Sequence, residues 1–197
     1  VIVGSGNVAE AIALALQEAG NPPVQIYARN EGAGRVIAEA CGCGFTSDPG
    51  SLARADLYII AVSDSAIAGI SGALAFGDAV VAHTAGSVTM EDVSPSIRNK
   101  AVIYPLQTFT KGRRVDFREV PVLVEGATPK ALKIATEAAG LISDNISEMD
   151  SAHRAQLHLA AVFASNFVNY MYTVGEELIS ASGVRFDIRK PLIAELA

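Results

Sequence analysis

The chain has 197 residues, of which half are hydrophobic and 18% are charged, so it can bury a large core and has no composition typical of disorder. Its 15 Lys and Arg against 21 Asp and Glu give a net charge of −6, which makes a nucleic acid an unfavourable partner. No apolar stretch reaches the roughly 18 residues that a spanning helix needs, and we therefore expect no contact with the membrane interior.

Short apolar runs alternate with helical stretches from the first residue onward. We expect strands near residues 1–3, 24–28, 57–62, 79–84, 102–104 and 122–124, with a seventh near 145–147. Helices are expected over 8–19 and 130–139, each followed by a glycine, Gly20 or Gly140, at the usual terminating position. This alternation predicts an α/β fold with a doubly wound, mostly parallel sheet built from βαβ units.

The pattern changes after Asp150. Residues 151–182 contain no proline and one glycine, which predicts a single long helix capped by Asp150 or Ser151 and kinked at Gly175. Another helix is expected to begin at Pro191. We therefore predict a first domain over residues 1–148 and an all-helical second domain over residues 149–197, which we expect to be incomplete.

A glycine-rich run, Gly4-Ser5-Gly6-Asn7-Val8-Ala9, joins the first expected strand to the first expected helix. In the G-x-G-x-x-A spacing, the first glycine permits a tight turn, the second lets the backbone approach a pyrophosphate, and the small third residue allows close packing of helix and strand. The N-terminus of the helix then faces the phosphates. The run predicts a dinucleotide-binding Rossmann unit, with cofactor contacts from Gly4, Ser5, Gly6, Asn7 and Val8.

The choice of dinucleotide depends on the residues after the second expected strand, where proteins that bind NAD usually place an acidic side chain. Here Arg29 can pair with a 2′-phosphate and Asn30 can add a hydrogen bond, so the sequence predicts NADP. Glu31 keeps NAD open as the alternative, if its carboxylate reaches the ribose. A flavin is the third candidate, and Arg29 makes it less favourable.

Polar residues follow two later strands, in Val62-Ser63-Asp64 and in the run from His83 to Ser87. Because open α/β sheets bind ligands at the carboxyl ends of their strands, we assign Val62, Ser63 and Ala85 to the cofactor site. His83 suits either a structural hydrogen bond or a ligand contact. Asp64 suits a helix cap at least as well as a ligand.

The loop after the fifth of the six main expected strands, Tyr104-Pro105-Leu106-Gln107-Thr108-Phe109-Thr110-Lys111, is polar and aromatic. We expect it to line a substrate pocket in which Lys111, or one of the arginines that follow it, Arg113 and Arg114, binds an anionic group, although a basic surface turn explains these residues equally well. Cys41 and Cys43 have neither the spacing of a metal site nor the number needed for a disulfide framework. We therefore predict no metal, and a reducing cytoplasm as the location.

On the long expected helix, five positions with helical spacing share a face: His158, Val162, Ser165, Asn169 and Tyr172. We interpret His158 as a general acid or base, with Asn166 and Asn169 orienting the substrate. The alternative is that His158 has a structural role and forms hydrogen bonds between the two domains. The opposite side is apolar and is predicted to be core, through Phe163, Ala164, Phe167 and Met171.

Together, the runs Gly4 to Ala9, His83 to Ser87, Tyr104 to Phe109 and His158 to Asn169 resemble one bacterial family. It comprises Rossmann-like proteins with a C-terminal domain of unknown function, often labelled NADP oxidoreductases. More distantly, the chain resembles pyrroline-5-carboxylate reductase and the deazaflavin-dependent NADP oxidoreductases. The resemblance implies a helical C-terminal domain like that of 6-phosphogluconate dehydrogenase, through which such proteins usually form homodimers.

The leading hypothesis from the sequence is an NADP-dependent oxidoreductase. It would transfer hydride to or from a small, anionic carbonyl or imine compound in an interdomain cleft. The helix around His158 lacks the Gly-Ser-Gly-Pro-Ala-like stretch of pyrroline-5-carboxylate reductases, which argues against proline synthesis. A non-catalytic NADP-binding sensor or regulatory protein is the alternative.

Overall fold

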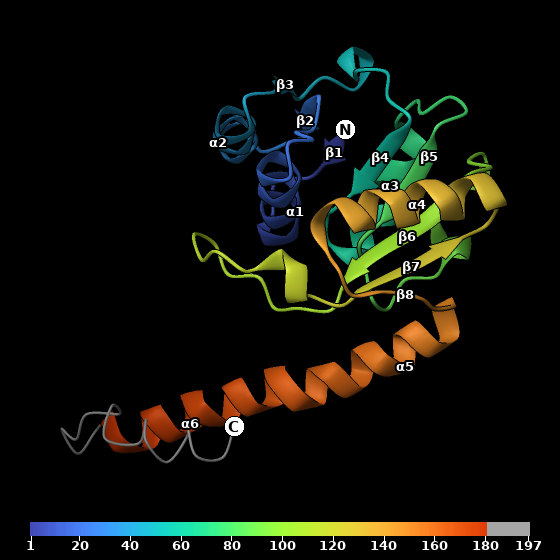
Figure 1. Cartoon of the computed structure of the whole chain (residues 1–197). Coiled ribbons are helices and arrows are strands. Elements are labelled where there is room, and N and C mark those ends of the chain that lie inside the picture. Colours follow the sequence, from blue (N-terminus) through green and yellow to red (C-terminus); the bar gives the residue numbers. More distant parts are fainter. Residues whose placement is uncertain (181–197) are drawn as a thin grey trace. The chain divides into compact units, whose positions relative to one another are not determined.

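An eight-stranded sheet organises residues 1–156 in the computed structural model, which describes residues 1–180 (Figure 1). The strands lie in the order β3-β2-β1-β4-β5-β6-β7-β8. Strands β2 and β3 are added on one side of β1, and β4 and the later strands are added on its other side. Strands β1 to β6 are parallel, β7 is antiparallel to β6, and β8 is parallel to β7. The strand bounds are β1 (Ile2–Val3), β2 (Gln25–Tyr27), β3 (Gly44–Thr46), β4 (Leu57–Ile60), β5 (Val80–His83), β6 (Lys100–Pro105), β7 (Val122–Gly126) and β8 (Ile146–Glu148).

The predicted doubly wound sheet is confirmed, with one strand that the sequence did not reveal. That strand, β3, is three residues long, begins with Gly44 and has no buried residue, so it carries little of the apolar signal by which strands are recognised. It completes the order 3-2-1-4-5-6 of dinucleotide-binding sheets. The switch point between β1 and β4 is where such sheets bind their ligands.

Four helices connect these strands: α1 (Asn7–Glu18), α2 (Glu31–Cys41), α3 (Asp64–Ala73) and α4 (Pro129–Ile142). Short 3-10 turns lie at Pro49–Ser51, Met90–Asp92 and Phe117–Glu119. Gly20 follows α1 with φ of +74°, as predicted. The prediction for Gly140 is wrong, because α4 continues past it to Ile142, which is buried in the core. Burial of that side chain offsets the roughly 1 kcal/mol that a glycine costs inside a helix.

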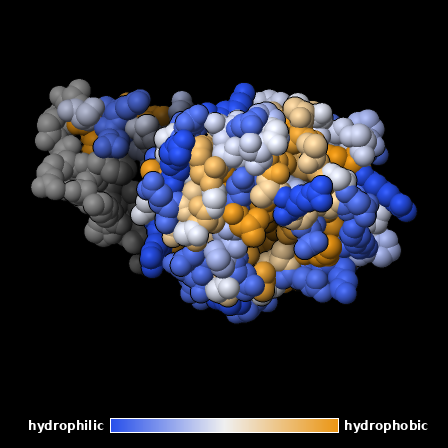
Figure 2. All heavy atoms as spheres, turned by 90° about the horizontal axis from the view of Figure 1, so that it is seen from above, coloured by the Kyte–Doolittle hydropathy of each residue, from blue (hydrophilic) through white to orange (hydrophobic). Residues whose placement is uncertain are grey.

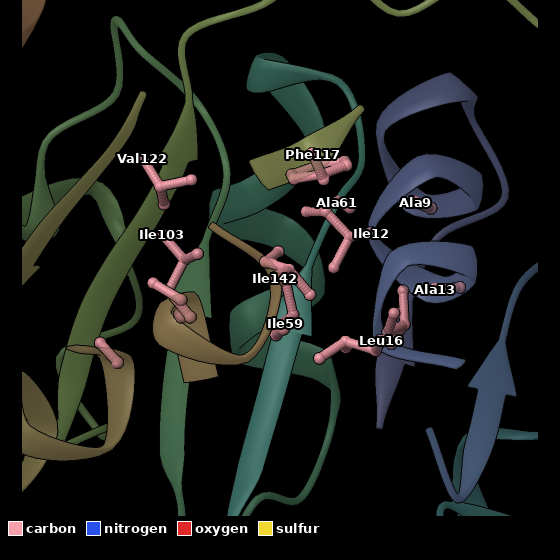
Figure 3. Close-up of a cluster of buried hydrophobic side chains, with 14 of the residues drawn as sticks. Ala9, Ile12, Ala13, Leu16, Ile59, Ala61, Ile103, Phe117, Val122 and Ile142 are labelled. Carbon is pink, nitrogen blue, oxygen red and sulfur yellow. The ribbon is translucent and has the colours of Figure 1, made fainter. Parts of the chain in front are cut away.

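Two apolar clusters cover the two faces of the sheet. One joins the buried sides of α1, α2 and α4 to alternate residues of the strands, and Figure 3 shows Ile12, Ile59, Ile103 and Ile142 converging in it. The other places Ile67 of α3 against the opposite face. On the face seen in Figure 2, hydrophilic residues alternate with patches of hydrophobic ones.

Helical structure resumes at α5 (Ser151–Ala161) and continues through a π-helical segment (Val162–Phe167) into α6 (Val168–Ser180). Asp150 caps this helix as predicted, since its Oδ1 accepts from the backbone N of His153 at 2.9 Å. The regular α-helix is interrupted at residues 162–167, whereas the predicted kink position, Gly175, lies inside α6. The helix predicted from Pro191 lies outside the described residues.

The chain divides into two compact units, residues 1–156 and 157–197. Within the described part of the second unit, Phe163, Phe167 and Met171 are 59%, 48% and 57% exposed. Against the prediction, these three side chains are therefore largely exposed and form no core among residues 157–180, because the side chains of one helix cannot bury one another. Among residues 1–180, no helix is long and apolar enough to cross a membrane.

Candidate functional site

The turn between β1 and α1 forms the floor of the candidate site. Gly4 has φ of +135°, and a Cβ at this position would lie 2.1 Å from the backbone oxygen of Ala61 in the neighbouring strand connection. Its backbone N donates to Tyr27 O of the other neighbour, β2, at 2.8 Å. Gly4 is thus required by the close approach of three chain segments, as the sequence motif predicts.

Gly6 serves a different purpose from Gly4. It is the N-cap residue of α1, it makes no side-chain cap, and a Cβ built on it meets no atom within 4 Å. The protein's own packing therefore does not require a glycine there, and the open space above Gly6 fits the close approach of a ligand. The first backbone N–H groups of α1 carry the positive end of the helix dipole and suit a pyrophosphate.

A cleft of about 850 Å³ opens over this turn. It is bounded by the β1–α1 turn, the end of β2, the segment from Ala61 to Ser63, the inner side of α3 and Phe109. Of the ten residues predicted to bind cofactor, nine line it: Gly4, Ser5, Gly6, Asn7, Val8, Arg29, Asn30, Val62 and Ser63. Ala85 does not line the cleft, and it is buried in the apolar cluster beneath α3.

At the end of β2, the side chains around Arg29 have distinct partners. Arg29 is exposed and borders the cleft. Asn30 is the N-cap of α2, and its Oδ1 accepts from the backbone N of Ala33 at 3.1 Å. Glu31 does not border the cleft: its Oε1 accepts from Ser47 Oγ at 2.8 Å and its Oε2 accepts from Arg35 Nη2 at 3.3 Å. The contact with Ser47 was not predicted from the sequence, because Ser47 follows β3, the strand that the sequence did not reveal.

The loop between β6 and β7 forms one wall of the cleft, whereas the sequence predicted only that this loop lines a substrate pocket. Asn7 Nδ2 donates to the backbone oxygen of Phe109 at 2.9 Å, which ties this loop to the start of α1. The Phe109 ring stacks on Phe117, with centroids 5.4 Å apart. Lys111, predicted to bind an anionic group, is exposed in the same loop and does not line the cleft.

His83, at the end of β5, is completely buried, and its Nδ1 accepts from the backbone N of Ala85 at 3.2 Å. An accepting Nδ1 places the proton of the neutral ring on Nε2, which finds no hydrogen-bond partner among the described residues. Burial, assisted by the positive charge of Arg154, lowers the pKa of His83 to about 4. His83 is therefore a neutral, buried imidazole near neutral pH.

Asp64 is the first residue of α3 rather than its cap, a position that Ser63 occupies. The Asp64 carboxylate accepts a hydrogen bond from Ser87 Oγ. This bond joins the start of α3 to the loop after β5. Two of the strand ends that the sequence marked as ligand-binding are thereby held together.

Arg154, in the first turn of α5, is a buried cation that the sequence analysis did not single out. Its Nη1 forms an ion pair with Glu125 of β7, and its Nη2 donates to Val88 O at 2.6 Å and to Ser151 Oγ at 3.1 Å. Ser151 Oγ in turn donates to Glu125 at 2.8 Å. These bonds attach the first turn of α5 to the sheet and to the loop after β5. An isolated arginine beyond the last strand gives no sequence signal for such a role.

The remaining predicted site residues lie on the helical segment formed by α5, the π-helical residues and α6. His158 belongs to the last turn of α5, Asn166 to the π-helical segment and Asn169 to the first turn of α6. Ser165 Oγ donates to the backbone oxygen of Ala161 at 2.9 Å and contacts Asn166 Oδ1 at 3.1 Å. A π turn holds about one more residue than an α turn and rotates the later residues of the helix by roughly 100°. The single face predicted through His158 and Asn169 is therefore broken.

Two families match parts of the chain. The family described as "NADP oxidoreductase coenzyme F420-dependent" matches residues 1–86, and the "Domain of unknown function (DUF2520)" matches residues 120–197. The Bacteroides fragilis protein BF3122, provisionally named an NADP oxidoreductase, is 36% identical with a TM-score of 0.92, over 98% of this chain and 76% of its own. The chain belongs to the DUF2520 family of Rossmann-fold proteins.

More distant solved structures share the fold of this DUF2520 protein. A reductive aminase from Aspergillus terreus, solved with NADPH and ethyl-5-oxohexanoate, is 15% identical over 99% of this chain and 70% of its own, with a TM-score of 0.75. A prephenate dehydrogenase from A. aeolicus, solved with hydroxyphenyl propionate and NAD⁺, is 14% identical over 91% of this chain and 68% of its own, with a TM-score of 0.73. No curated protein matches the chain.

Within residues 1–180, no group of His, Cys, Asp and Glu side chains is arranged to hold a metal ion. The donors that line the cleft are backbone N–H groups, the side-chain amides of Asn7 and Asn30, hydroxyls and one guanidinium. Such donors suit the phosphates of a dinucleotide. The open space at Gly6 would let these phosphates come close to the backbone.

Proposed function

We propose that this protein is an NADP-dependent oxidoreductase that transfers hydride to or from a small, anionic carbonyl or imine compound. The observation that carries the proposal is the cleft at the switch point of the sheet, with its glycine turn, uncapped helix N-terminus and Arg29. The named activity of BF3122 and the NADPH bound by the reductive aminase support it. NAD⁺ in the prephenate dehydrogenase keeps the NAD alternative as an outcome to be tested.

In this proposal the nicotinamide cofactor supplies or accepts the hydride. The α1 N-terminus with Gly6 and Asn7 holds the pyrophosphate, and Arg29 pairs with the 2′-phosphate. Val62 and Ser63 position the nicotinamide half at the carboxyl end of β4. Glu31 is already engaged by Ser47 and Arg35, which favours Arg29 as the residue that reads the ribose.

The proposed catalytic group is His158, which would exchange a proton with the carbonyl or imine as hydride moves. Asn166 and Asn169 would orient the substrate, and Lys111 would bind its anionic group. The substrate is expected in the cleft that the sequence predicts between the two domains. We further propose a homodimer formed through the helical domain, whose exposed Phe163 and Met171 suit an apolar interface, and a cytoplasmic location.

Oxidation of NADPH, followed by its absorbance during a screen of small keto acids, aldehydes and cyclic imines, tests this function. His158→Ala should abolish turnover while NADPH affinity stays within about twofold. His153→Ala is the matched control, since His153 lies on the same helix, is exposed and bonds to Asp150. Turnover that survives His158→Ala would remove this residue from the mechanism. Cofactor binding without turnover of any compound would favour the sensor alternative.

A further inference from the structure

The surroundings of Glu31 carry an inference about cofactor choice that rests on the proposed function. Glu31 is the first residue of α2 and lies two positions after Arg29, where a carboxylate free to turn would accept from a ribose 2′-hydroxyl and repel a 2′-phosphate. A protein selective for NADP must prevent this. The carboxylate cannot be ignored, because its side chain is 57% exposed next to the cleft residues Arg29 and Asn30.

Both carboxylate oxygens of Glu31 accept hydrogen bonds, one from the residue after β3 and one from the next turn of α2. Ser47 Oγ, just after β3, donates to Oε1 at 2.8 Å, and Arg35 Nη2 donates to Oε2 at 3.3 Å. The hydroxyl bond first, and then the guanidinium, hold the pKa of Glu31 below its usual value. The carboxylate therefore stays ionised and has its charge balanced locally.

The two donors are themselves held in place. The Arg35 guanidinium lies over the Phe45 ring, 4.8 Å from its centroid. Phe45 belongs to β3, and α2 packs so closely on it that a Cβ at Gly34 would lie 2.4 Å from the ring. Ser47 continues from the same strand. Helix α2 and strand β3 thus form a close-packed support that presents Ser47 and Arg35 to the two oxygens of Glu31.

We propose that Ser47 and Arg35 are specificity-determining residues, which hold the Glu31 carboxylate away from the cofactor and so allow Arg29 to bind a 2′-phosphate. They act on the cofactor through Glu31, and they are positioning residues in this sense. With Glu31 held, the three charged side chains at this edge, Arg29, Arg35 and Glu31, sum to a net charge of +1. Release of Glu31 would place a negative charge beside the phosphate.

The test compares the affinities of two ligands that differ only by the 2′-phosphate. Adenosine 2′,5′-bisphosphate and adenosine 5′-monophosphate are titrated into each variant of the whole chain, followed by NADPH and NADH. Ser47→Ala should raise the Kd of the 2′-phosphorylated ligands about two- to fivefold, the size expected for one like charge near the surface. The Kd of adenosine 5′-monophosphate and of NADH should stay unchanged or fall. Ser51→Ala is the matched control, since Ser51 Oγ bonds to a different carboxylate, Asp48, at 2.7 Å.

A second variant separates positioning from direct contact. Glu31→Gln removes the repelling charge, so the preference for 2′-phosphate should persist, and adding Ser47→Ala in this background should then change that preference less than twofold. Equal losses with and without Glu31→Gln would overturn the proposal, because Ser47 would then touch the phosphate itself. An unchanged affinity ratio in Ser47→Ala would overturn it as well. Failure of the wild type to bind either dinucleotide would overturn the proposed function, and this inference with it.

Discussion

Replacement of Arg154 by methionine tests how the first turn of α5, residues 151–156, is held against the sheet. Arg154 is fully buried, and the Glu125 side chain that it pairs with is only 14% exposed. Removing one partner of a buried ion pair leaves an uncompensated charge and costs about 3–5 kcal/mol. Val88 O also loses a donor, which costs about 1–3 kcal/mol when the oxygen stays buried.

The expected loss is therefore at least about 3 kcal/mol, a large part of the ~5–15 kcal/mol that stabilises a typical domain. Urea denaturation followed by circular dichroism measures it, since the chain has no tryptophan to report by fluorescence. The double variant Glu125→Met with Arg154→Met removes both charges and should recover most of the loss.

Arg118→Met is the matched control. Arg118 pairs with Asp144 at 3.2 Å, but these side chains are 51% and 75% exposed, so we expect a change below about 1 kcal/mol. A loss in Arg154→Met no larger than that of Arg118→Met would refute the reasoning. So would a double variant less stable than the single one, because the buried charge of Glu125 would then not be the cause.

Three further predictions concern the glycine turn and the buried histidine. Gly4→Ala should prevent stable folding, as judged by circular dichroism, because its Cβ would lie 2.1 Å from Ala61 O; a native spectrum would contradict this. Gly6→Val should fold normally, with no atom within 4 Å of the new Cβ, yet weaken NADPH binding at least about tenfold by blocking the phosphate approach. Between pH 6.5 and 4, His83 is protonated in the unfolded chain but stays neutral in the folded protein. The free energy of unfolding should therefore fall on acidification by up to about 1.4 kcal/mol per pH unit. His83→Asn should flatten this dependence in urea denaturations, and a slope identical to that of the wild type would disprove the role of His83.

The sequence was most informative where one residue type has one physical use. Gly4 and Gly6 at their spacing predicted the turn, and nine of the ten predicted cofactor residues line one cleft. Ala85 does not line this cleft and is buried in an apolar cluster, because its position after a strand does not define which way the chain turns, and its contact with the cofactor stays a prediction. The roles of His158, Asn166, Asn169 and Lys111 stay predictions.

Features set by tertiary context could not be predicted in the same way. Strand β3 is short and unburied, and it is recognised only by its pairing with β2. Strand β7 is antiparallel to β6, and the segment that joins them contains a short 3-10 turn and no crossover helix, which the apolar pattern of the two strands does not reveal. The π-helical segment at residues 162–167 contains neither proline nor glycine, so the sequence predicted an α-helix without a break there.

Binding of NADP in the cleft is tested by calorimetric titration of the wild type and of Arg29→Ala with NADPH and with NADH. We expect the wild type to prefer NADPH and Arg29→Ala to lose this preference, with NADPH binding weakened about 10- to 100-fold, as for loss of a charge-assisted hydrogen bond. NADH affinity should stay the same. Equal weakening of both nucleotides, or a folded wild type that binds neither, would contradict the claim.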